Sequence, residues 1–107
     1  MSYCVIKDGD KNTLRCLMDK ICREQDEKID ITKNGDEYSV IFQDSKFYLI
    51  ITDAKRMHRD YMEGPFFLEI DEKRTEMKDG SSGHKKMKAN QEFARYITEI
   101  IKQLKNV

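Results

Sequence analysis

The side chains that most often carry chemistry are few and dispersed in this sequence of 107 residues. Its three cysteines, Cys4, Cys16 and Cys22, are an odd number, and none belongs to the Cys-x-x-Cys pairs of zinc and redox sites. Its two histidines, His58 and His84, have no second ligand at metal-site spacing. We therefore expect reduced thiols that are buried or half-buried as small apolar groups, with no metal and no disulfide framework.

Two loops match parts of ligand-binding motifs but lack the residues that bind most strongly. Residues 8–12 begin like a calcium loop, yet Thr13 and Asp19 occupy the positions of its essential Gly and bidentate Glu. Residues 80–86 are rich in Gly and Lys, but their glycine spacing differs from that of a nucleotide-binding loop. No nucleophile lies within a recognisable catalytic signature. We therefore expect no cofactor and no enzymatic activity.

Basic side chains form two clusters whose charge suits phosphate groups. The first consists of Lys55, Arg56 and Arg59, and the second of Arg74, Lys85, Lys86 and Lys88. Acidic residues dilute the second cluster, and no aromatic residue is interleaved with it for base stacking. Nucleic-acid binding is therefore an alternative function, and the simpler interpretation is a solvated basic loop.

The overall composition is that of one very soluble domain, residues 1–107. Charged residues make up 37% of the chain, and 20 basic residues balance 20 acidic ones, so no net field attracts nucleic acid or anionic lipid. Acidic residues exceed basic ones in the first half and the reverse holds in the second. No signal peptide is visible, and the longest apolar run, 47–51, is far shorter than the roughly 20 residues of a membrane span. We expect a cytoplasmic protein with no membrane association.

The first secondary-structure element that we expect is a short strand at 3–6. A helix follows, because Leu14, Leu17, Met18 and Ile21 fall on one stripe at helical spacing. Its expected N-cap is Asn12 or Thr13.

Residues 29–51 alternate between apolar and polar, which predicts a three-stranded antiparallel meander. Turns at Asn34-Gly35 and Asp44-Ser45 would place Ile31 opposite Tyr38 and Val40 opposite Leu49. The same alternation groups Ile41, Tyr48 and Ile50 on the other face of the sheet. Either a helix of this chain covers these three residues, or a partner does.

The remaining segments complete an α+β fold. Residues 54–62 suggest a short helix, or alternatively an extension of the preceding strand through Thr52. A strand at 66–71, a mobile polar loop at about 72–88 and a helix at about 90–105 follow. The expected order is β-α-β-β-β-(α)-β-α, with a single antiparallel sheet, the meander plus one or two flanking strands, packed against an N-terminal and a C-terminal helix.

These expectations favour a small binding module that acts through protein–protein contacts, such as an adaptor, an inhibitor, or an immunity- or phage-type antagonist. Its candidate contact residues are Ile41, Tyr48 and Ile50. A further alternative is self-association into a homodimer through a sheet edge at 65–70.

Overall fold

The computed structural model describes residues 3–24, 27–53 and 66–105. Its elements are β1 (Tyr3–Asp8), α1 (Lys11–Arg23), β2 (Ile29–Asn34), β3 (Glu37–Phe42), β4 (Ser45–Asp53), β5 (Phe66–Ile70), the 3-10 turn η1 (Glu72–Arg74) and α3 (His84–Lys105). The predicted α+β class is confirmed, and β4 extends through Thr52 to Asp53, as the alternative interpretation held. The predicted helix at 54–62 lies outside the described residues.

The five strands form one antiparallel sheet in the order β1-β5-β4-β3-β2. The edge strands are therefore β1 and β2, whereas β5 pairs with β1 on one side and with β4 on the other. Self-association through an exposed edge at 65–70 was thus a wrong prediction, because both sides of β5 are already paired.

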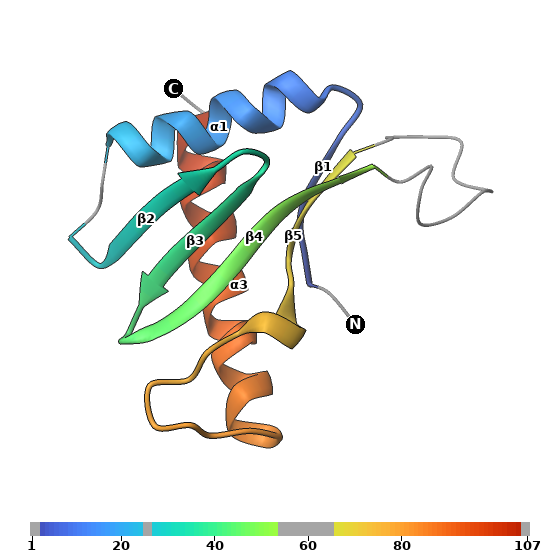
Figure 1. Ribbon diagram of the computed structural model, residues 1–107. Coiled ribbons are helices and arrows are strands. Elements are labelled where there is room, and N and C mark those ends of the chain that lie inside the picture. The colour runs from blue at the N-terminus through green and yellow to red at the C-terminus, as the bar shows by residue number, and fades with distance from the viewer. Residues whose placement is uncertain (1–2, 25–26, 54–65, 106–107) are drawn as a thin grey trace.

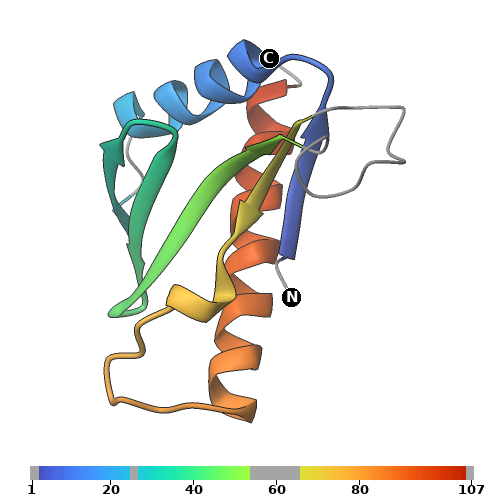
Figure 2. The same ribbon diagram turned by 45° about the vertical axis from the view of Figure 1, so that its right-hand side comes forward.

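Both helices contribute to a single core on one face of the sheet. In Figures 1 and 2, α3 runs along the back of the sheet and α1 crosses its upper end. Buried residues from each of the five strands and from both helices form one apolar cluster, which includes Leu14, Val40, Leu49, Leu68 and Phe93. The predicted core face is confirmed, and the helices lie on the same side of the sheet.

The strand register differs from the prediction at both turns of the meander. The turn residues are Gly35-Asp36 and Gln43-Asp44, so Val40 lies opposite both Ile31 and Phe47. Each pairing is displaced by two positions along the partner strand. Because side chains alternate with a period of two, this displacement leaves the same residues facing the core.

The first turn is fixed by its contact with α1. Gly35 adopts a φ of +64°, which glycine accommodates without steric cost. The carboxylate of Asp36 lies 2.6 Å from Lys11 Nζ and 2.7 Å from a guanidinium nitrogen of Arg15. Asp36 therefore joins the turn to α1 from the position just before β3.

The N-terminus of α1 begins earlier than expected. Asp10, in extended conformation, is the N-cap, and its Oδ1 accepts the backbone N–H of Asn12 at 3.0 Å. The predicted caps, Asn12 and Thr13, lie within the first turn of the helix, and the Thr13 hydroxyl donates to the same Asp10 carboxylate.

The segment 72–88 contains more regular structure than the predicted loop. After η1, the backbone of Glu76 exchanges two hydrogen bonds with that of Lys46, at 2.8 and 2.9 Å. The α3 helix then begins at His84 rather than near residue 90. A buried hydrogen bond of 2.7 Å from the Thr75 hydroxyl to Asn90 Oδ1 joins this segment to α3.

Replacing the first residue of the β3–β4 turn should stabilise the protein. Gln43 and Asp44 have φ values of 51° and 66°, a conformation that costs a residue with a Cβ about 1–2 kcal/mol. Gln43→Gly removes that strain and should raise the free energy of unfolding by about 0.5–1 kcal/mol after the entropy of glycine is subtracted. Urea unfolding measures this change. The matched variant Gly35→Ala should move stability in the opposite direction, and equal effects of both variants would contradict the turn assignment.

The ion pairs of Asp36 should make stability depend on pH. Hydrogen bonds from Lys11 and Arg15, and then the positive charges of these two residues, hold the pKa of the Asp36 carboxyl below its ordinary value of 3.8. This contribution is complete above the ordinary pKa and is lost as the pH falls through the lowered one. Because the pair is partly exposed and screened by solvent, Asp36→Asn should cost only about 0.5–1 kcal/mol near neutral pH. The cost should vanish in acid, and Asp30→Asn, at an exposed position of β2, is the control.

Candidate functional site

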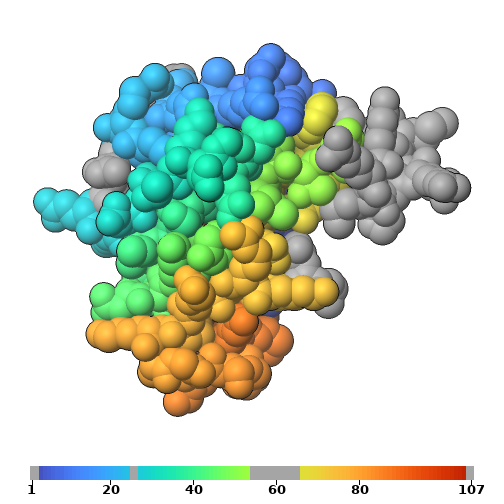
Figure 3. Space-filling view, in the orientation of Figure 1, coloured from blue at the N-terminus to red at the C-terminus, as the bar shows by residue number. Residues whose placement is uncertain are grey.

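The face of the sheet opposite the helices is the main candidate site. We call it the open face and define it by Glu37, Ser39 and Ile41 of β3 and Lys46, Tyr48 and Ile50 of β4. Figure 3 shows its green atoms uncovered between α1, in blue, and the orange segment that follows η1. Neither α1 nor α3 packs over it, whereas η1 and the residues after it reach its edge through Arg74 and Glu76. Of the two interpretations of this face, cover by one of the two long helices therefore does not apply to the described residues.

The three predicted contact residues are neighbours on this face. Ile41 is diagonal to Tyr48 across the β3–β4 ladder, and Ile50 follows Tyr48 by two positions on the same strand. Ile41 retains 44% of its surface exposed, whereas Tyr48 and Ile50 are half-buried. The open face therefore presents an apolar strip with its most exposed side chain at the turn end.

Tyr48 is held in place by a group of charged residues. Two cations lie over its ring, with Arg74 Cζ 4.1 Å and Lys46 Nζ 5.5 Å from the ring centroid. Its hydroxyl donates to Glu76 Oε2 at 3.0 Å. Arg74 also forms an ion pair with Glu37, and this hydrogen bond raises the pKa of the Arg74 guanidinium further above its ordinary value. The sequence did not predict this cluster, because Arg74 and Glu76 reach Tyr48 only through the fold.

The basic residues singled out in the sequence are not gathered in one place. Arg74 belongs to the open face, and Lys85 and Lys88 line a hollow beside the β3–β4 turn. Lys86 lies elsewhere on α3, with its Nζ 3.5 Å from the carbonyl oxygen of Lys73. The cluster formed by Lys55, Arg56 and Arg59 lies outside the described residues.

The cysteines are more exposed than predicted. Cys4 and Cys16 are exposed, and only Cys22 is half-buried, because Cys4 and Cys16 lie on the solvent sides of β1 and α1. Partial desolvation of its sulfur by neighbouring atoms, and then the nearby charge of Glu69, raise the pKa of the Cys4 thiol. Burial and Asp19 raise the pKa of Cys22. A raised pKa lowers the fraction of thiolate, the reactive form of cysteine.

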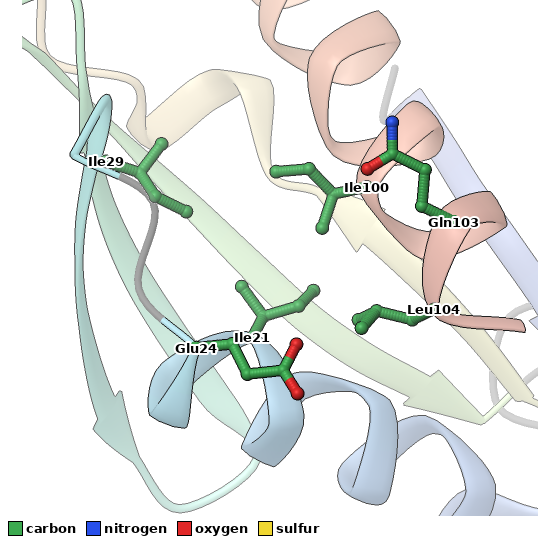
Figure 4. A pocket seen from close by; sticks show the side chains of 6 residues that line it. All are labelled: Ile21, Glu24, Ile29, Ile100, Gln103 and Leu104. Atoms are coloured by element: carbon green, nitrogen blue, oxygen red, sulfur yellow. The ribbon is translucent and has the colours of Figure 1, made fainter. Parts of the chain in front are cut away.

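An apolar hollow of about 150 Å³ lies where the C-terminal ends of α1 and α3 approach the start of β2. Figure 4 shows Ile21, Ile29, Ile100 and Leu104 lining it, with the polar ends of Glu24 and Gln103 beside them. Its volume is below the roughly 300 Å³ at which small-molecule pockets begin. We therefore interpret it as imperfect packing between the two helix ends.

Within residues 3–24, 27–53 and 66–105, no group of three or more His, Cys, Asp or Glu side chains is arranged to hold a metal ion. Neither α1 nor α3 has the combined length and apolar character of a helix that crosses a membrane.

Comparison with known proteins yields no relative: no family model matches the chain, and neither the curated proteins nor the solved structures contain a match. The fold and site define the class of the molecule as a two-layer α+β protein with one face of its sheet covered by neither α1 nor α3.

A pair of matched substitutions tests whether the open face is solvated. Ile41→Thr keeps a β-branched residue at an exposed position and should change the free energy of unfolding by less than about 0.5 kcal/mol. Ile31→Thr, in the adjacent strand but on the core face, should cost about 2 kcal/mol or more, because it buries a hydroxyl in place of an ethyl group. Chemical denaturation measures both values. A large loss for Ile41→Thr would mean that part of this chain covers the face.

Proposed function

We propose that this protein is a small binding module whose partner is another protein and whose contact surface is the open face. The observation that carries the proposal is the exposure of Ile41 beside Tyr48 and Ile50 on a face that neither α1 nor α3 covers. An antiparallel sheet that packs on one side normally presents polar side chains to water on the other. Grouped apolar and aromatic residues on such a face are typical of a contact surface.

The fixed position of Tyr48 supports the same function. Tyrosine and arginine are enriched among the residues that contribute most to protein interfaces. Here the Tyr48 ring is already oriented by Arg74, Lys46 and Glu76, so a partner would lose little side-chain entropy in binding it. Side chains ordered before binding favour both affinity and a defined orientation.

The charges around the apolar strip suit a protein partner better than a polyanion. Lys46 and Arg74 alternate with Glu37 and Glu76, so both signs are present within one small surface. Mixed charge at the rim of an interface orients a partner of complementary pattern and excludes others. A phosphate backbone would instead require a surface dominated by cations. Adaptor and inhibitor are the roles that such a surface serves.

Site-specific photocrosslinking tests the proposal. A photoreactive phenylalanine analogue replaces Ile41 in one variant and Lys20, on the exposed side of α1, in the control. After irradiation in native cells, the position-41 variant should give a discrete protein adduct that mass spectrometry identifies. The control should not give this adduct.

Two results would contradict the proposal. One is equal labelling from both positions, which would indicate random encounters. The other is an adduct that disappears on nuclease treatment, which would favour nucleic-acid binding. Ile41→Asp should also reduce the yield of the specific adduct from a second photoreactive site at Ser39, because it places a charge in the apolar strip.

A further inference from the structure

A second hollow, of about 300 Å³, lies beside the β3–β4 turn on the helix side of the sheet. Phe42, Phe47 and Met77 contribute its apolar surface. Three charged side chains of α3, Lys85, Lys88 and Glu92, stand around it. Its volume matches the lower end of the range of about 300–1,000 Å³ found for small-molecule sites, and it is separate from the open face.

The apolar surface of this hollow is held rigidly by aromatic packing. The ring of Phe47 stacks on Phe93 with centroids 4.3 Å apart, and the ring of Phe42 stacks on Tyr96 at 4.7 Å. The Ser45 hydroxyl lies 3.8 Å from the sulfur of Met77 and accepts the backbone N–H of Lys78 at 3.4 Å. The hollow is therefore formed before any ligand arrives, which lowers the entropic cost of binding.

The charged side chains favour an anion with a single negative charge. Lys85 and Lys88 are three residues apart on α3 and so lie on the same side of the helix. Neither forms an ion pair with any described residue, although Asp79 lies near Lys85: hydrogen bonds from Ser81, and to a smaller extent the Lys85 charge, lower the pKa of the Asp79 carboxyl. Glu92 carries the opposing charge. The two ammonium groups therefore lie together at one side of the apolar surface, and the nearby carboxylates of Glu92 and Asp79 limit how much negative charge that side can attract.

We propose that this hollow binds a small amphipathic carboxylate. The apolar tail of the ligand packs against Phe42 and Met77, and its carboxylate lies between Lys85 and Lys88. Glu92 and Asp79 repel a phosphate dianion more strongly than a carboxylate, which carries a single negative charge. The N-terminal end of α3, which carries a partial positive charge, adds to the attraction. This site is independent of the proposed protein-binding function.

Nuclear magnetic resonance titration with 3-phenylpropionate tests the site. We expect concentration-dependent shifts of the backbone amides of Phe42, Met77 and Ala89 and of the Met77 methyl group. Acetate, which lacks the tail, and 3-phenylpropanol, which lacks the charge, should each bind several-fold more weakly. Raising the salt concentration should also weaken the binding of 3-phenylpropionate.

Charge variants make the result decisive. The double variant Lys85→Gln/Lys88→Gln should weaken binding by about three- to tenfold, as expected for two partly exposed ion pairs. Glu92→Gln should tighten it by about two- to threefold. The control variant Lys102→Gln/Lys105→Gln also removes two positive charges from α3, but at its other end. It should have no effect on the affinity for 3-phenylpropionate.

Three results would overturn the proposal: no shifts at the hollow, equal binding of 3-phenylpropanol, or affinities that these charge variants leave unchanged. Circular dichroism of each variant confirms that α3 remains folded. The photocrosslinking test at position 41 does not depend on ligand binding in this hollow. A negative titration would therefore overturn this proposal and leave the proposed protein-binding function untouched.

Discussion

The rest of the structure depends on the burial of one face of a five-stranded sheet. The alternating residues of the meander place Tyr38, Val40, Phe47 and Leu49 on that face, and all four are at most 1% exposed. Burial of large apolar side chains is the dominant favourable contribution to folding. Both α1 and α3 are needed to cover this surface, so neither helix is left for the other side. The open face is thus a direct consequence of where the helices must pack.

Alternation explains why the fold class could be predicted from the sequence even though the turns could not. Each apolar position of each strand independently indicates which face of the sheet is buried, so the prediction of the core face does not depend on any single residue. Each turn, by contrast, depends on a few atoms: the Asp36 carboxylate that meets Lys11 and Arg15, and the left-handed backbone at Gln43 and Asp44. Asn34-Gly35 is a strong turn pattern in isolation, but these long-range ion pairs favour a turn displaced by one residue.

The candidate site was only partly visible in the sequence. Local alternation placed Ile41, Tyr48 and Ile50 together, since these residues belong to adjacent strands. The contacts of Arg74 with Glu37 and Tyr48 join residues far apart in the chain, and no local pattern records them. The first turns of α3 were missed for a related reason. Residues 84–89 have good helix-forming side chains but few apolar ones, and their anchor is the Thr75–Asn90 hydrogen bond.

The position of β5 between β1 and β4 has a consequence for the order in which the chain folds. During synthesis β1 emerges first, but its partner in the sheet, β5, is made only after α1 and the whole meander. The β2–β3–β4 meander and α1 can form early from local contacts, whereas β1 must wait for a strand about sixty residues away. Closing such a long loop slows folding. We therefore regard the β1–β5 ladder as the last part of the sheet to form. The pairing of these two strands is then the step that sets the folding rate of the protein.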